Sequence, residues 1–180
     1  MGNDDGHMLS FDAFHAAAPS IASKVRNKFE VAGMCMLATL RKDGSPRLSA
    51  VEVMFDDGRL MVGMMPGSVK ALDLLRDPRC SLMTTIADKD DLSGEGKLFA
   101  QAVAWTDPAE IARFLGSAAE RLEMDVEAFD GSHVFEIQVI GAAWQHVDGD
   151  AFVTESWNEG QPIRLRRRAG ANGYPVDVPI

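Results

Sequence analysis

The sequence predicts a mainly β domain, an antiparallel barrel of six or seven strands, closed or partly closed, with appended helices. Two Asp-Gly turns, Asp43-Gly44 and Asp57-Gly58, join three short runs that have the character of β-strands. The strand-like runs follow one another in hairpin order, without the regular strand–helix alternation of a doubly wound parallel sheet. A barrel built from hairpins fits this order better than a parallel sheet does.

The chain is expected to begin with a disordered or tag-like segment at residues 1–9, followed by helices at residues 10–30. Within the helical region, Ile21, Val25 and Phe29 recur at four-residue spacing, with basic residues between them. Pro19 divides the region into a short first helix and a longer second one, because proline is tolerated at the first helical position but not in a helix interior.

A three-stranded meander follows the helices and is the strongest structural signal in the sequence. Its predicted strands are Met34–Leu40, Arg47–Phe55 and Arg59–Met65. Pro66-Gly67 ends the third strand, and Ser68–Arg76 has the pattern of a short helix. Apolar residues gather on one face of that helix, namely Val69, Leu72 and Leu75.

The second half of the chain continues with hairpins and one more helix. Strands are predicted at Cys80–Ile86 and Lys97–Trp105 around a polar loop at 87–96, and again at Val134–Val147 and Ala151–Trp157. Asp107 and Pro108 are typical of a helix start. Residues 111, 114 and 115 are its expected inner face, and residues 116–131 are expected to be helical turns and loop. We assign the barrel to residues 31–168 and a C-terminal tail to residues 169–180, and we expect the stretch from Asn158 onward to be irregular.

Composition narrows the possible partners. The net charge of −9 argues against nucleic acid as the main partner, because binding to a phosphate backbone needs a basic surface. No apolar stretch approaches the length of a membrane span, and the first residues lack a secretory signal, so we expect a cytoplasmic protein. Cys35 and Cys80 lie in apolar runs and are expected to be reduced thiols in the core.

The segment Gly67-Ser68-Val69-Lys70 is the first candidate for a binding function. A strand ends, a glycine turns the backbone, and a helix opens with a hydroxyl and an ammonium group in its first turn. The free backbone N–H groups of such a helix start bind anions, and phosphate in particular. The alternative is an ordinary surface helix with a solvated lysine.

Two further segments are candidates. The tail from Trp157 contains arginines at positions 164, 166, 167 and 168, whose guanidinium groups suit phosphate and carboxylate. A solvated basic end that neutralises an acidic body explains them equally well. Arg47–Glu52 mixes polar and apolar residues, either as a binding strand or as a strand with one wet face. The four histidines lack metal-ligand spacing, so no metal is expected.

Taken in order, these segments resemble the flavin-binding split barrels of the pyridoxamine 5'-phosphate oxidase-like family. The resemblance covers about Gly33 to Arg168 and is most specific at residues 37–47, at Gly67 to Ala71 and at Asp77-Pro78-Arg79. It implies a homodimer that holds flavin mononucleotide (FMN) between its two barrels. The implied cofactor contacts are Arg47, Leu48, Ser49, Ala50, Val51, Glu52, Gly63, Met64, Ser68, Lys70, Trp157 and Arg168, and the implied substrate contacts are Arg164 and Arg166.

The sequence also departs from the family pattern. Glu52 stands where the true oxidases have a substrate-binding lysine, Val69 replaces a phosphate-binding arginine, and Arg166 replaces a substrate-site histidine. These differences favour a relative over the oxidase itself. We expect an FMN-dependent oxidoreductase that acts on a small molecule. The alternatives are a deazaflavin-dependent reductase and a flavin- or haem-binding protein without turnover, for which His15, His133 or His146 would be the possible haem ligands.

Overall fold

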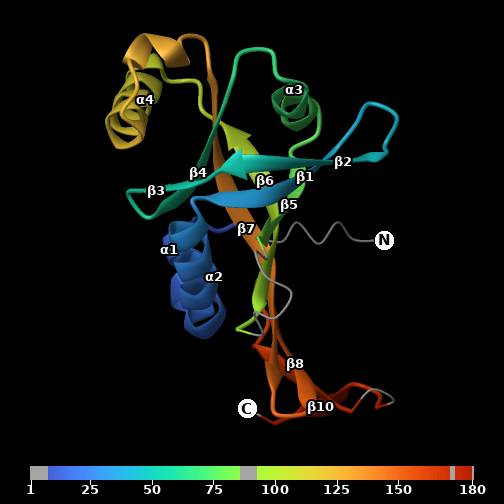
Figure 1. The fold of residues 1–180 in the computed structure, drawn as a ribbon. Coiled ribbons are helices and arrows are strands. Elements are labelled where there is room, and N and C mark those ends of the chain that lie inside the picture. Colours follow the sequence, from blue (N-terminus) through green and yellow to red (C-terminus); the bar gives the residue numbers. More distant parts are fainter. Residues whose placement is uncertain (1–7, 86–92, 171–172, 180) are drawn as a thin grey trace.

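The computed structural model describes residues 8–85, 93–170 and 173–179 (Figure 1). Helices and strands follow the hairpin order that the sequence predicts. The helices are α1 (Phe11–Ala17), α2 (Pro19–Ala32), α3 (Val69–Arg76), α4 (Pro108–Leu122) and the short 3-10 helix η1 (Val126–Phe129). The strands are β1 (Met34–Leu40), β2 (Pro46–Glu52), β3 (Met54–Asp56), β4 (Arg59–Met64), β5 (Arg79–Thr84), β6 (Glu95–Ala104), β7 (His133–Asp148), β8 (Ala151–Asn158), β9 (Arg164–Ala169) and β10 (Val176–Val178).

All described strands join one antiparallel sheet in the order β10-β9-β8-β7-β6-β5-β1-β2, and β4 pairs with both β3 and β7. The predicted mainly β, antiparallel class is confirmed. The sheet does not close, because β2 and β4 share no ladder in the described part of the chain. Ten strands replace the six or seven expected. The long strand β7 links the barrel-like part to the C-terminal layer of β8–β10 (Figure 1).

The meander is present, but its middle strand is broken. The predicted strand Arg47–Phe55 is two strands, β2 and β3, which meet at Val53. The N–H of Val53 donates to the carbonyl of Gly33 at 3.3 Å, and its side chain is buried. This break lets β2 pair with β1 while β3 pairs with β4. At the second Asp-Gly turn, Asp57 and Gly58 both have positive φ, of 46° and 73°, as the turn type requires.

The two N-terminal helices form a large part of the core. Phe11, Phe14 and Ile21 are fully buried, and the ring of Phe14 lies 5.2 Å from that of Trp157. Leu9 exchanges backbone hydrogen bonds with Val139, at 3.0 and 2.8 Å. Leu9, which the sequence placed in the disordered or tag-like segment, is therefore held against β7. Residues 1–7 lie outside the described part.

Two other expectations need correction. The tail after Asn158 is not irregular, because Arg164–Ala169 forms β9 against β8, and β10 pairs with β9. Helix α3 does not bury the face formed by Val69, Leu72 and Leu75, which are 57%, 49% and 51% exposed. It buries the neighbouring face, which includes Asp73. Residues 86–92, most of the predicted loop at 87–96, lie outside the described residues.

Candidate functional site

Strand β2 forms one border of the candidate site. It is the last strand in the sheet order, so only β1 pairs with it in the described part of the chain. Arg47 and Ser49 are half-buried, whereas Leu48, Ala50 and Glu52 are exposed. Arg47 and Glu52 lie five residues apart, which corresponds to about 17 Å of extended strand. The strand therefore presents a cation at one end and a carboxylate at the other.

The turn before α3 holds an unsatisfied hydroxyl. Gly67 adopts a positive φ of 65°, and Ser68 occupies the position before the first helical residue. Serine at this position usually caps the helix. Here Ser68 makes no such hydrogen bond, and its Oγ is buried without a hydrogen-bond partner in the described structure. A buried polar atom without a partner is destabilising, so this hydroxyl is suited to a ligand.

The backbone of the same turn is partly occupied. The N–H of Gly67 donates to Nε2 of His133 at 3.3 Å, and the N–H of Ser68 donates to the carbonyl of Met65 at 3.2 Å. The remaining free amides are those of the first turn of α3, beginning at Val69. Lys70 in that turn is half-buried and forms no ion pair with any residue that the structure describes. In the sequence-predicted anion site, the hydroxyl of Ser68 and the ammonium group of Lys70 therefore remain available to a ligand.

A buried carboxylate orders the cationic end of β2. Asp73 is 4% exposed and accepts hydrogen bonds from Nε of Arg47 at 2.6 Å, Oγ1 of Thr39 at 3.1 Å and Nη2 of Arg76 at 3.2 Å. Burial raises the pKa of Asp73, but these hydrogen bonds outweigh it and hold the pKa below its ordinary value. Arg47 is therefore fixed to α3, beside a shallow depression that Arg41 also lines.

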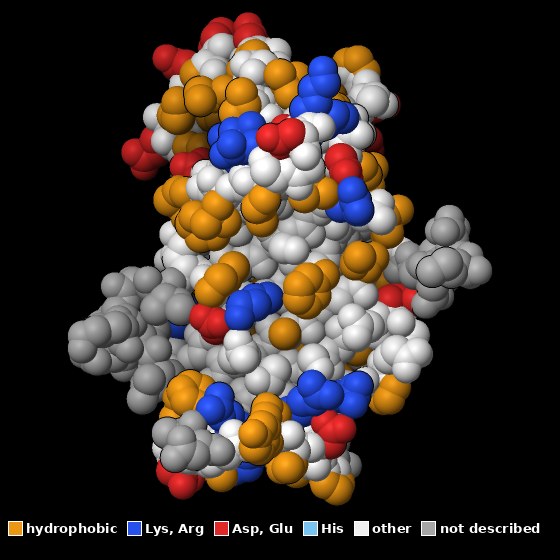
Figure 2. All heavy atoms as spheres, turned by 90° about the vertical axis from the view of Figure 1, so that its right-hand side faces the viewer, with side chains coloured by type: hydrophobic (Ala, Val, Ile, Leu, Met, Phe, Trp, Pro, Cys, Tyr) orange, Lys and Arg blue, Asp and Glu red, His pale blue; other side chains and the backbone are white. Residues whose placement is uncertain are grey.

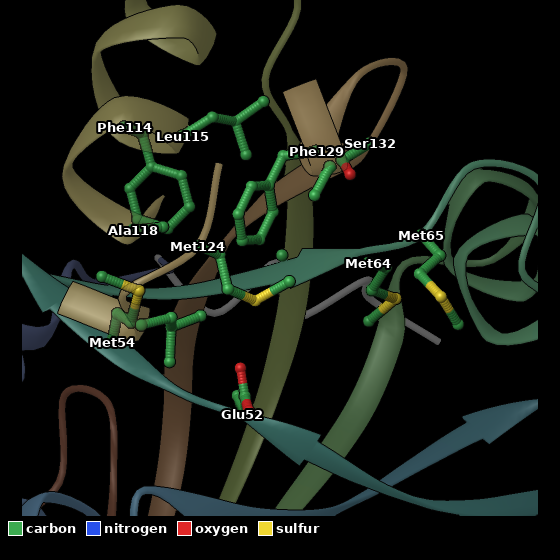
Figure 3. Close-up of a pocket in the computed structure, with 13 residues that line it drawn as sticks. Glu52, Met54, Met64, Met65, Phe114, Leu115, Ala118, Met124, Phe129 and Ser132 are labelled. Atoms are coloured by element: carbon green, nitrogen blue, oxygen red, sulfur yellow. The ribbon is translucent and has the colours of Figure 1, made fainter. Parts of the chain in front are cut away.

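An apolar pocket of about 230 Å³ lies at the other end of β2 (Figure 3). Phe114 of α4 and Phe129 of η1 face it from above, and methionines surround it. Its lining residues are Glu52, Met54, Gly63, Met64, Met65, Phe114, Leu115, Ala118, Leu122, Met124, Ala128, Phe129 and Ser132. The predicted contacts Glu52, Gly63 and Met64 thus meet in one pocket. Segment 116–131, which the sequence predicts as helical turns and loop, supplies five of the lining residues.

The C-terminal candidates lie elsewhere in this chain. Trp157 is 3% exposed and packs on Phe14 in the core. Arg164 and Arg166 of β9 both donate to Asp177 of β10, at 3.1 and 2.9 Å. The layer of β8–β10 stands at the opposite end of the molecule from α3 and α4 (Figure 1).

Arg168 also belongs to this C-terminal layer. It lines a depression with Phe152 and Thr154 of β8. The structure therefore does not bring Arg164, Arg166 or Arg168 to the pocket of the same chain.

Sequence reasoning missed several residues of this region. Asp73, Phe114 and Phe129 contribute to the site, but they are far from β2 in sequence. The one local signal was Asp73 itself, a carboxylate three residues before Arg76 on a short helix.

The described residues contain neither a candidate metal cluster nor a candidate membrane-spanning helix. No group of three or more His, Cys, Asp or Glu side chains comes together there in a way that could hold a metal ion. None of the helices in the described ranges combines the length and the hydropathy needed to cross a membrane. Cys35 and Cys80 are buried and free, and burial raises the pKa of each thiol to about 12.

Solved structures share this fold. A Clostridium acetobutylicum protein of the pyridoxinephosphate oxidase family, related to general stress protein 26 of B. subtilis, is 12% identical with a TM-score of 0.57, covering 74% of this chain and 90% of that one. ChuZ of Campylobacter jejuni is 13% identical with a TM-score of 0.63, and the match covers 89% of this chain and 67% of ChuZ. HutZ, a haem storage protein from Vibrio cholerae, is 16% identical with a TM-score of 0.54, and the match covers 81% of this chain and 96% of HutZ.

Of the two sequence comparisons, the one with protein-family profiles found a match that agrees with the fold. A search of the curated proteins found no matching sequence. The sequence profile described as pyridoxamine 5'-phosphate oxidase matches residues 21–148, which is more than half of the chain. That range includes the edge strand β2, the turn at Ser68 and all the residues named as lining the apolar pocket. The chain therefore belongs to the pyridoxamine 5'-phosphate oxidase family.

Proposed function

We propose that the protein binds FMN and acts as an FMN-dependent oxidoreductase on a small molecule. The observation that carries this proposal is the buried Oγ of Ser68, which has no partner and stands next to Lys70 at the start of α3. A phosphate would accept from the hydroxyl, from the ammonium group and from the free amides of the first helical turn. The residues present therefore fit the phosphate of the cofactor.

The other predicted contacts would serve the remainder of the cofactor. Residues 47–52 offer an unpaired strand edge along which a flat ring can lie, with Gly63 and Met64 of β4 beside it. Gly63 lacks a side chain, and a Cβ there would meet only Phe114, at 4.0 Å. FMN when bound supplies hydride or electron transfer, so the chain itself binds, orients and shields the reactants.

The same proposal includes a homodimer. The open edge of β2 and the exposed face of α3 leave unpaired backbone groups and apolar side chains at one side of the molecule. Figure 2 views that side and shows hydrophobic side chains across it, interspersed with Lys and Arg. A second copy seated there would cover this surface. It could also bring Arg164, Arg166 and Arg168 to the site of its partner.

Haem is the second candidate, because HutZ is a haem storage protein and another matched structure is a haem-binding protein from Mycobacterium smegmatis. The described histidines favour FMN over haem. His133 is engaged with Gly67, His15 is hydrogen-bonded to Ser23 at 3.0 Å, and His146 lies near the end of β7, beside the C-terminal layer. None of these three lines the apolar pocket. A deazaflavin with an acidic tail would instead use the cations beside Arg47.

Fluorescence titration of the purified protein with FMN tests the proposal. We expect saturable quenching, and about tenfold weaker binding in Lys70→Ala and in Ser68→Ala, because each loses a charge-assisted contact to the phosphate. Lys28→Ala removes the same charge from α2, on the other side of the sheet, and should bind like wild type. Parallel titrations with a deazaflavin and with haemin identify the preferred cofactor. Unchanged affinity in both site variants would overturn the assignment of the phosphate site.

A further inference from the structure

The carboxylate of Glu52 faces the apolar pocket without a partner. Figure 3 shows it rising from β2 toward Met124, below the two phenyl rings. It forms no hydrogen bond or ion pair with any described residue, whereas Glu155, Glu30 and Glu95 each pair with a lysine or an arginine. A single unpaired charge at the floor of a pocket is a recognition element for a ligand of opposite charge.

The residues that line the pocket strengthen the preference for a cationic ligand. Glu52 is the only charged residue among the lining residues, and Ser132 is the only one with a polar uncharged side chain. Phe114 is 1% exposed, Met64 is 3% exposed, and both present hydrocarbon or thioether surface. Charge interactions are stronger next to such surface than in open water. An anionic ligand would meet Glu52 without a compensating cation.

We propose that this pocket takes an apolar molecule that bears one cationic group, such as an amine on an aromatic or aliphatic body, with Glu52 as the residue that recognises the cation. The inference rests on the proposed function, because the pocket adjoins the strand assigned to the cofactor ring. The phenyl rings of Phe114 and Phe129 and the flexible methionine side chains would pack against the apolar body.

The two ends of the site thus differ in charge. Lys70 and Arg47 stand at the end assigned to the phosphate, and Glu52 stands at the pocket. A phosphorylated or carboxylate substrate would be repelled at the pocket, whereas a cation would be attracted. We therefore assign to Glu52 the selection of cationic over anionic ligands.

Isothermal titration calorimetry with three probes of one shape tests this inference: phenylpropylamine, phenylpropanol and phenylpropionate. Each is titrated into wild-type protein with and without FMN. We expect the amine to bind tightest and the acid weakest. Glu52→Gln should weaken amine binding about tenfold, because a charge-assisted hydrogen bond is lost, and should leave the alcohol within about twofold. Glu30→Gln, the same change on α2, should alter neither probe.

A second variant locates the probe. Ala128 is exposed at the pocket mouth, so Ala128→Trp should block the amine and the alcohol alike without disturbing the core. Equal affinity of amine and acid, unchanged amine binding in Glu52→Gln, or no detectable binding of any probe would each overturn the inference. Failure of FMN to bind wild type would overturn the proposed function instead, and the titrations without FMN would still measure the charge preference.

Discussion

Replacing Asp73 with asparagine removes the carboxylate that accepts hydrogen bonds from Arg47 of β2 and from Arg76 of α3 itself. Breaking a fully buried ion pair by removing one partner costs about 3–5 kcal/mol. The side chains of Arg47 and Arg76 remain 23% and 38% exposed, so water compensates part of the loss. Asparagine also keeps a hydrogen bond with Thr39. We therefore expect Asp73→Asn to lower the free energy of unfolding by about 2 kcal/mol.

Thermal unfolding followed by circular dichroism measures this change. For a chain of this length, about 2 kcal/mol corresponds to a Tm that is roughly 4–8 °C lower. Asp77→Asn is the matched control, because Asp77 pairs with Arg79 next to the same helix but the Arg79 side chain is 69% exposed. We expect a clearly smaller shift in that control. Equal shifts in the two variants would refute the role given to burial of Asp73.

The pH dependence of the same variant provides an independent check. The folded protein holds the pKa of Asp73 below its ordinary value, where hydrogen bonds from Arg47, Arg76 and Thr39 outweigh burial. Such a group stabilises the fold fully above its unfolded pKa of about 3.9, and this contribution is lost as pH falls through the lower folded pKa. The difference between wild type and Asp73→Asn should therefore persist at neutral pH and shrink below about pH 3.9.

Three further predictions concern the core. Phe14→Ala removes a fully buried ring and should destabilise the protein by about 3–5 kcal/mol in urea unfolding. Gly96→Ala places a Cβ 2.6 Å from Cγ2 of Val25, so the same assay should show a loss of about 1–3 kcal/mol. Because burial raises the pKa of Cys35 and Cys80 to about 12, both thiols should react with dithionitrobenzoate far more slowly in native than in unfolded protein; equal rates would contradict their burial.

Local signals predicted most of the fold. Gly44 at the first Asp-Gly turn and both Asp57 and Gly58 at the second have positive φ angles, and Asp107 caps α4 through the N–H groups of Ala109 and Glu110. The C-terminal strands were missed because Arg164 and Arg166 suggest a solvated tail. Their pairing with Asp177 depends on a contact that sequence patterns do not display.

The wrong prediction of the buried face of α3 has the same cause, because that face is determined by tertiary contacts. Val69, Leu72 and Leu75 share a face, but Ala71 and Leu74 share another, and helical spacing alone does not decide between them. The fold decides, because Arg47 of β2 and Thr39 of β1 reach Asp73 on the buried face.

The candidate site was predictable only in part. Glu52, Gly63 and Met64 meet as expected because neighbouring hairpins bring them together. Phe114 and Phe129 were outside the reach of local reasoning, since α4 and η1 meet β4 only through tertiary packing. The C-terminal arginines, which the resemblance implied as site residues, lie away from the pocket of this chain.

The length of β7 has a consequence for how the protein folds. This strand of sixteen residues pairs with β6 along most of its length, with β4 at its start and with β8 at its end. Strands β4 and β6 can pair with β7 only after residues 133–148 have been synthesised. Because these pairings join residues that are distant in sequence, we expect folding to be slow. Because one strand joins both parts, we expect them to unfold in a single cooperative transition.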